Sequence, residues 1–205
     1  MNPSFALIVE GSDDQHVLYA LLQYHHFEPK FQILNDVGYE QLIKRLPARL
    51  SLLSGISRLG VIVDADASLH SRWESIKAIL IKTGYEDVPD VPDQNGTVID
   101  HEALPRVGIW IMPNNSISGM LEDYLRFLVP EGDLLFERAN RVLEEIPLDQ
   151  RKFAPQHRSK AHIHTWLAWQ DDPGTPLGLA ITKRYLNADA SGVAPLIAWL
   201  NRVFT

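Results

Sequence analysis

The sequence contains no cysteine among its 205 residues. It can therefore form neither a disulfide framework nor a thiolate metal site. No apolar run approaches the ~20 residues that a membrane-spanning helix needs. The first residues also lack the basic start and the apolar core of a signal peptide. These absences exclude a disulfide-stabilised secreted module and a helical membrane protein, and we expect a cytoplasmic protein without membrane association.

Positive charge is also scarce, with 19 Lys and Arg residues against 26 Asp and Glu residues and a formal net charge of −7. This balance argues against a protein whose whole surface binds nucleic acid, although it leaves room for a local basic groove. The sequence has no glycine-rich phosphate loop, no nucleophile elbow and no zinc-type ligand spacing. An excess of carboxylates suits a protein that gathers them around a cation.

Apolar runs alternate with stretches of helical spacing through the first part of the chain. Strands followed by helices predict a mainly parallel sheet with right-handed crossovers. A proline-containing excursion over 86–106 interrupts the pattern, and an excursion of this length often lines or covers a site. The predicted strands are 5–9, 31–37, 59–63, 97–99 and 107–112. A first helix is predicted to begin at residue 12, and three further helices are predicted over 39–53, 71–83 and 119–128.

The rest of the chain has no strong strand pattern. Helical spacing appears at 134–146, 159–170 and 193–204, separated by prolines. We therefore expect an α/β domain over residues 1–129 and a helical annex over residues 130–205 that packs on it as one compact unit. Within the annex, Trp166, Trp169 and Trp199 are expected as core anchors. The histidines do not converge at helical spacing, so we interpret them as structural or surface residues.

Carboxylates follow two of the predicted strands. Glu10 ends the first strand, and Asp64 and Asp66 come at the end of the third. Ligands of parallel sheets bind beyond the carboxyl ends of the strands. Alternation along a strand would point Asp64 and Asp66 the same way, with β-carbons ~6–7 Å apart. Three such carboxylates repel one another unless a cation lies between them, and oxygen ligands favour Mg²⁺ or Mn²⁺.

Two motifs give these carboxylates a family context. Val9-Glu10-Gly11-Ser12-Asp13-Asp14 resembles the strand-Glu-Gly motif of Toprim domains, and Val61-Ile62-Val63-Asp64-Ala65-Asp66 resembles their Asp-x-Asp motif. Toprim domains occur in topoisomerases, primases, recombination proteins and the overcoming-lysogenization-defect nucleases. The resemblance covers roughly residues 5 to 128. Gly119 to Asp123 and the stretch from Lys160 to Ala168 are similar to standalone Toprim-related proteins of unassigned function from bacteria and archaea.

The resemblance implies roles for particular residues. The paired aspartates Asp64 and Asp66 would hold Mg²⁺, while Glu10 would be a general acid or base, or a ligand. A third acid or a glycine often continues the aspartate pair, and here Ala67 follows. Further residues that could join the site are Glu122 or Asp123, Asp14 and Lys160, which could contact a phosphate. Their alternative roles are helix-terminus electrostatics for Asp14, Glu122 and Asp123, and a solvated surface charge for Lys160.

The sequence thus predicts a Toprim-like metal-dependent nuclease or a related phosphodiester-processing enzyme. Nucleic acid is the expected partner, such domains often act beside a protein partner, and a role in defence or DNA maintenance is an analogy. The alternative is a non-catalytic Toprim-like module that binds a metal, a nucleotide or a partner. A phospho-accepting receiver is a third reading, which the Met112-Pro113-Asn114 sequence disfavours because it lacks the required lysine.

Overall fold

A five-stranded sheet forms the centre of the computed structural model, which describes residues 4–205. The strand order is β2-β1-β3-β5-β4. The first four strands in this order are parallel, and β4 runs antiparallel to β5 at the edge. The α/β class and the mainly parallel sheet are therefore confirmed. The strands are β1 (Phe5–Val9), β2 (Gln32–Asn35), β3 (Arg58–Asp64), β4 (Thr97–Ile99) and β5 (Arg106–Met112).

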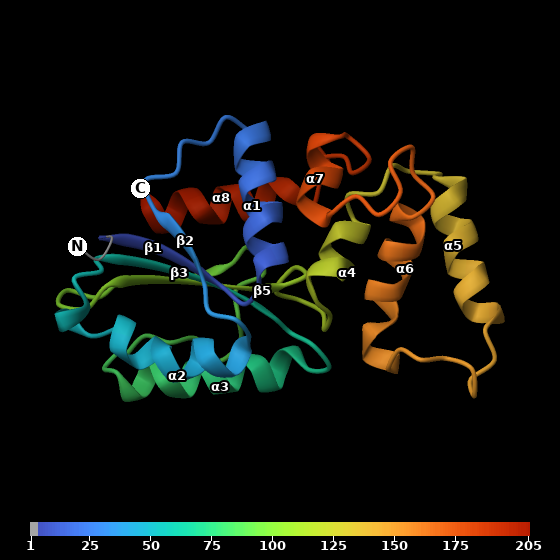
Figure 1. Cartoon of the computed structure of the whole chain (residues 1–205). Coiled ribbons are helices and arrows are strands. Elements are labelled where there is room, and N and C mark those ends of the chain that lie inside the picture. The colour runs from blue at the N-terminus through green and yellow to red at the C-terminus, as the bar shows by residue number, and fades with distance from the viewer. Residues whose placement is uncertain (1–3) are drawn as a thin grey trace.

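Helices cover both faces of this sheet (Figure 1). One face carries α2 (Tyr39–Arg49) and α3 (Leu69–Lys82), and the other carries α1 (Ser12–Tyr24) and α8 (Val193–Phe204). Successive strand residues alternate between the two hydrophobic cores. In β1, Ala6 and Ile8 face the core under α2 and α3, whereas Leu7 and Val9 face the other core. This two-sided burial explains the continuous apolar runs in the strand sequences.

The last helix belongs to the main sandwich because it lies close against the sheet. A Cβ atom at Gly108 of β5 would lie 2.2 Å from Val203 Cγ2, and one at Gly96 would lie 2.3 Å from Trp199 Cδ1. Glycine is thus required where α8 crosses the strands. Residues 130–205 therefore contribute one covering helix of the sheet in addition to the helices beside it.

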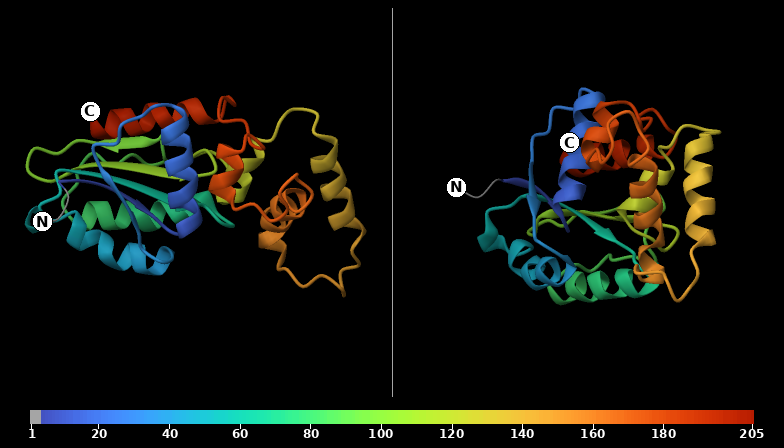
Figure 2. Two further views of the ribbon diagram at one scale, coloured as in Figure 1. Left: turned by 45° about the horizontal axis from the view of Figure 1, so that its top comes forward. Right: turned by 45° about the vertical axis from the view of Figure 1, so that its right-hand side comes forward.

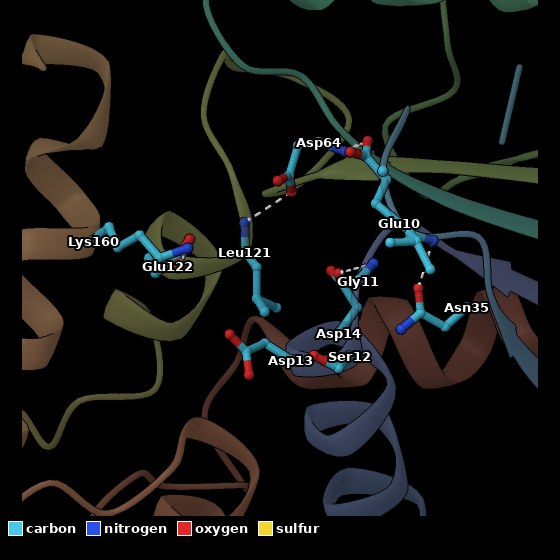
Figure 3. A pocket seen from close by; sticks show the side chains of 12 residues that line it. Glu10, Gly11, Ser12, Asp13, Asp14, Asn35, Asp64, Leu121, Glu122 and Lys160 are labelled. Carbon is cyan, nitrogen blue, oxygen red and sulfur yellow. Dashed lines mark hydrogen bonds and ion pairs between the residues drawn. The ribbon is translucent and has the colours of Figure 1, made fainter. Parts of the chain in front are cut away.

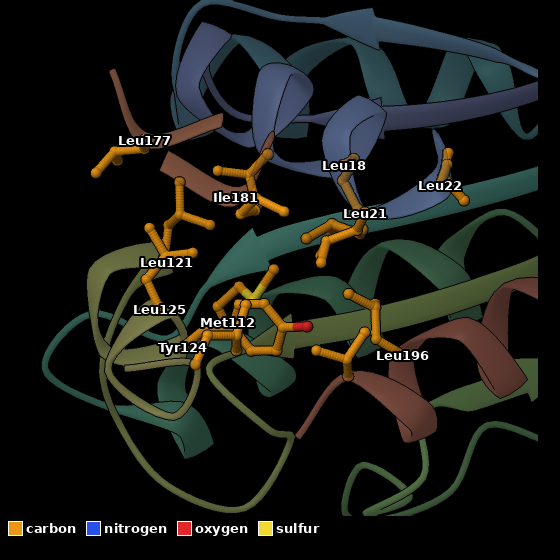
Figure 4. Close-up of a cluster of buried hydrophobic side chains, with 14 of the residues drawn as sticks. Leu18, Leu21, Leu22, Met112, Leu121, Tyr124, Leu125, Leu177, Ile181 and Leu196 are labelled. Carbon is orange, nitrogen blue, oxygen red and sulfur yellow. The ribbon is translucent and has the colours of Figure 1, made fainter. Parts of the chain in front are cut away.

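The other helices of this region lie on the side of the sheet where the parallel strands end (Figures 1 and 2). The remaining elements are α4 (Leu121–Arg126), α5 (Leu134–Glu145), α6 (Arg158–Leu167), α7 (Leu177–Thr182) and the short 3₁₀ helices Leu52–Ser54 and Pro155–His157. The helices α5 and α6 pack against each other, α6 contacts α4, and α7 packs along α1. Leucine-rich faces of α1, α4, α7 and α8 meet in one buried cluster (Figure 4).

The expected helical anchors are confirmed in part. Trp166 and Trp199 are buried, but Trp169 is 38% exposed, so the expectation of a third anchor there is wrong. Trp199 Nε1 donates to the Thr97 carbonyl at 3.2 Å. The buried indole nitrogen of Trp166 has no hydrogen-bond partner within residues 4–205. No helix of the described chain combines the length and the apolar character needed to cross a bilayer.

Candidate functional site

A pocket of about 380 Å³ lies at the carboxyl ends of β1 and β3 (Figure 3). Its lining is acidic, and Lys160 carries the only positive charge among the described residues that line it. Five segments far apart in the sequence contribute: the junction of β1 and α1, the loop after β2, the end of β3, the start of α4 and one residue of helix 158–167. The acidic residues that line the pocket are Glu10, Asp13, Asp14, Asp64 and Glu122.

Backbone hydrogen bonds hold the two strand-end carboxylates. Glu10 follows β1, and its Oε1 accepts a hydrogen bond from the Asp64 amide at 2.8 Å. Asp64 ends β3, and its Oδ1 accepts from the Leu121 amide at the start of α4 at 2.9 Å. These two bonds join β1, β3 and α4 at the floor of the pocket. The predicted convergence of Glu10 and Asp64 beyond the sheet edge is therefore confirmed.

Asp14 combines a helix-terminus role with a place in the pocket. It lies in the first turn of α1, where its Oδ2 accepts from the Gly11 amide at 2.9 Å. This contact agrees with the electrostatic interpretation of Asp14 at the helix start. However, its side chain is also buried and lines the pocket beside Glu10 and Asp64. The two interpretations of Asp14 are thus compatible.

Glu122 and Lys160 form an ion pair at the pocket wall. Glu122 in the first turn of α4 is 3% exposed, and its Oε1 lies 3.1 Å from Lys160 Nζ. The Lys160 side chain comes from α6 and remains 50% exposed. One end of this pair is therefore buried among carboxylates, and the other reaches solvent.

Burial and mutual repulsion make ionisation of the cluster unfavourable. Burial, followed by the charges of Asp14, Glu10 and other neighbours, raises the pKa of Asp64 to about 9. Burial also raises the pKa of Asp14 to about 7, with the nearby Glu10 charge adding to it, and raises the pKa of Glu10. Without a cation, these carboxyls retain protons at pH values where isolated carboxyls are fully charged.

The oxygen atoms that are not held by the backbone fit a hard cation. Glu10, Asp14 and Asp64 each use one oxygen to accept an amide hydrogen bond. The second oxygen of each carboxylate takes no part in that amide contact. In the described chain, no three His, Asp or Glu side chains already stand in a metal-holding arrangement. The donor set therefore suits Mg²⁺ or Mn²⁺, and the side chains would have to converge further to hold one.

Asp66 does not line the pocket, although its charge adds to the rise in the pKa of Asp64 that burial causes. The strand ends at Asp64, and Asp66 adopts a left-handed backbone with φ +50°, so the expected strand alternation through Asp66 is wrong. Its carboxylate forms an ion pair with Arg72, whose guanidinium carbon lies 3.4 Å from the centroid of the Tyr39 ring. Arg72 thus neutralises one of the three carboxylates that we expected to repel one another. It was not foreseen because it lies on the following helix, one turn beyond the motif.

Asp123 stabilises the start of α4 and its packing on α6. Its Oδ2 accepts from the Met120 amide at 3.0 Å, its Oδ1 accepts from the Ser159 hydroxyl, and Arg126 lies 3.6 Å away. Asp123 does not line the pocket. Of the two acidic residues predicted as alternatives at this helix start, Glu122 is the one that faces the carboxylates.

One rim of the pocket was not anticipated from the sequence. The segment after β2 brings Asn35, Val37 and Gly38 to the pocket. The sequence signal is a valine between an aspartate and a glycine at a strand end, where turn residues such as asparagine or glycine are usual. We did not interpret that signal as part of a site.

Comparisons with known proteins identify one family. No curated protein and no solved structure gives a match to this chain. One family model does match, over residues 4–205, and its description is "Protein of unknown function (DUF3226)". Because the matched region spans both the sheet and the helices beside it, the chain belongs to the DUF3226 family.

Proposed function

We propose that this protein is a Toprim-like, Mg²⁺- or Mn²⁺-dependent enzyme that cleaves phosphodiester bonds in nucleic acid. The observation that carries the proposal is the pocket in which Glu10, Asp14, Asp64 and Glu122 converge with a single lysine. Such a cluster is unfavourable in the folded protein unless a cation neutralises it. The motif resemblance of Glu10 and Asp64 supports the same assignment.

Asp14, Asp64 and Glu122 are the residues that would hold the metal, and Glu10 lies beside them as the proton-transfer group. A bound divalent cation would neutralise phosphate oxygens and lower the pKa of a water molecule, as it does in phosphoryl-transfer enzymes. The amide hydrogen bonds to Glu10 and Asp64 fix the direction of both carboxylates. Because these two directions are fixed, fewer side chains have to reorganise when the carboxylates converge on a cation.

Lys160 is the candidate for binding the phosphate group of a substrate. Its Nζ is paired with Glu122, and its side chain, which lines the pocket, is half exposed. An ammonium group has three hydrogen-bond donors, so Lys160 can contact Glu122 and a phosphate oxygen together. Glu10 is the candidate for proton transfer, because burial raises its pKa and brings that pKa nearer to neutral pH than the pKa of an exposed glutamate.

A second candidate function is a non-catalytic module of the same type, which binds a metal, a nucleotide or a partner. One observation favours the form of this module that binds a nucleotide or a partner: the carboxylates of the described chain are not already arranged around a metal position. The two candidates share the site and differ in turnover, so an activity measurement separates them.

The function is tested by comparing wild type with Glu10→Gln and Asp64→Asn in cleavage of supercoiled DNA, single-stranded DNA and RNA. We expect cleavage by wild type only when Mg²⁺ or Mn²⁺ is present. Asp64→Asn should lose both Mn²⁺ binding and cleavage, because it removes a ligand charge. Glu10→Gln should retain Mn²⁺ binding but turn over about 10²- to 10⁴-fold more slowly, since general acid–base catalysis typically contributes that much.

Asp66→Asn is the matched control, because Asp66 is paired with Arg72 outside the pocket. It should retain most of the metal affinity. Parallel loss of Mn²⁺ binding in Glu10→Gln and Asp64→Asn would make Glu10 a ligand. A wild type that binds Mn²⁺ yet cleaves none of the substrates would favour the non-catalytic module.

A further inference from the structure

Val37 has an unfavourable backbone conformation and an unfavourable environment. Its φ is +59°, in the left-handed region that β-branched residues rarely adopt. Its side chain is 81% exposed, so no burial of apolar surface offsets that conformation. Outliers of this kind persist where the surrounding structure imposes them, and they concentrate at ligand-contacting positions.

The surrounding residues impose the conformation of Val37. Its amide donates to Asn35 Oδ1 at 2.8 Å, and the Gly38 amide donates to the Glu10 carbonyl at 2.8 Å. Between them, Asp36 is 1% exposed and forms ion pairs with Arg45 and Arg49 of α2. The loop is thus fixed on both sides of Val37, and its valine is presented to solvent by a rigid support.

This loop forms one rim of the carboxylate pocket. Asn35, Val37 and Gly38 line the same pocket as Glu10 and Asp64. Figure 3 shows Asn35 and Lys160 on opposite sides of the carboxylates. The pocket therefore has a positive wall at Lys160, an acidic floor and an uncharged rim.

The chemistry of the rim differs from that of a phosphate contact. Because Asn35 Oδ1 accepts from the Val37 amide, its Nδ2 is the atom left as a donor, and it has no partner within residues 4–205. A free amide donor beside exposed methyl groups offers one hydrogen bond and an apolar surface. That combination suits a nucleobase, which carries acceptor atoms at its edge and an apolar face.

We propose that Val37 and Asn35 bind the base of a nucleotide next to the phosphate in the carboxylate pocket. The base must be unpaired to lie against this rim, so the preferred substrate is a single strand. This inference rests on the proposed function, because it assigns the substrate class of the same site. It adds Val37 as a residue that positions the substrate and takes no part in bond cleavage.

The test uses Val37→Asn, since asparagine accepts the left-handed conformation and removes the apolar methyl groups. Val91→Asn is the matched control, because Val91 is also an exposed valine (68%) and does not line this pocket. Binding of a fluorescein-labelled oligothymidine is measured by anisotropy in Ca²⁺, alongside thermal unfolding. Val37→Asn should weaken binding about fivefold to tenfold, since partial burial of a valine is worth roughly that much.

A strand with a single abasic position completes the design. When the missing base is the one at the rim, the affinity of wild type for the strand should fall by a similar factor. The affinity of Val37→Asn should fall little further, because the two changes remove the same contact. Val37→Asn should also melt a few degrees higher than wild type, because it relieves the backbone strain. Val91→Asn should change neither property.

Two results would overturn the inference and leave the proposed function standing. The first is equal binding of the strand by wild type and Val37→Asn, and the second is a lower melting temperature for Val37→Asn than for wild type. A wild type that binds no strand in any divalent cation would contradict the proposed function, and the inference would fail with it.

Discussion

Asp64→Asn is expected to stabilise the metal-free protein at neutral and alkaline pH while it abolishes cleavage. Burial and neighbouring carboxylates raise the pKa of Asp64 from its ordinary value of 3.8 to about 9. The folded state therefore favours the protonated carboxyl. This contribution to stability is fully present below the unfolded pKa and is lost as pH rises through the folded pKa. Metal-free wild type should become less stable between about pH 4 and pH 9.

Asparagine cannot ionise and retains an oxygen that can accept from the Leu121 amide. The free energy of unfolding of Asp64→Asn in EDTA at pH 8 should exceed that of wild type by about 1–3 kcal/mol, which raises Tm by roughly 3–10 °C in a chain of this size. Saturating Mg²⁺ should reverse the order, because only wild type gains stability from binding.

Differential scanning calorimetry across this pH range measures the effect, with Asp66→Asn as the control. Asp66 is half exposed and paired with Arg72, so its replacement should not stabilise the protein. An Asp64→Asn protein that melts at or below the wild-type temperature at pH 8 in EDTA would show that the Asp64 carboxyl is not held in an unfavourable environment.

Trp166→Ala is expected to lower the free energy of unfolding by about 3–5 kcal/mol, as for other buried aromatic residues. Trp166 is 1% exposed in α6, and its ring makes an edge contact with Phe136 of α5 at 5.8 Å between centroids. The helix also carries Ser159 and Lys160, which contact α4. Loss of this anchor should therefore weaken the wall of the pocket as well as the fold.

Two companion variants separate the packing of the ring from other effects. Trp166→Phe keeps an aromatic ring and removes an indole nitrogen that has no hydrogen-bond partner in the described chain, so its loss should be below about 1.5 kcal/mol. Trp169→Ala removes a ring that is 38% exposed and should cost clearly less stability than Trp166→Ala, because less apolar surface is lost from the core. Chemical denaturation of all three compares them directly, and a Trp166→Ala protein as stable as wild type would contradict the packing described here.

The sequence was most informative where a regular pattern extends over many residues. The apolar runs of β1, β3 and β5 and the helical spacing of α3, α5 and α8 predicted those elements to within a few residues of their observed ends. Such patterns arise because buried positions are apolar, on both faces of a sheet or on one face of a helix, and the spacing of apolar residues is visible in the sequence itself. The short helix α7 was not predicted, because it has a single turn of buried residues after a proline-rich loop.

The site could be predicted only as far as the strand ends specify it. Glu10 and Asp64 are placed by the sheet, so their convergence follows from strand order. Asp66 depends on one backbone angle beyond the strand and on Arg72, and neither is visible in a motif. The strain at Val37 is likewise a property of the folded loop, since it arises from contacts with Asn35 and the buried Asp36.

The central claim is that the carboxylate pocket binds a divalent cation. It is tested most directly by calorimetric titration of metal-free protein with Mn²⁺ at pH 7 in buffers of different ionisation heat. The raised pKa of Asp64, due first to its burial, predicts that binding releases protons, so the observed heat should depend on the buffer. Asp64→Asn should bind much more weakly, and Asp66→Asn nearly as well as wild type. Equal Mn²⁺ affinity in wild type and Asp64→Asn, or no binding by wild type, would contradict the metal site.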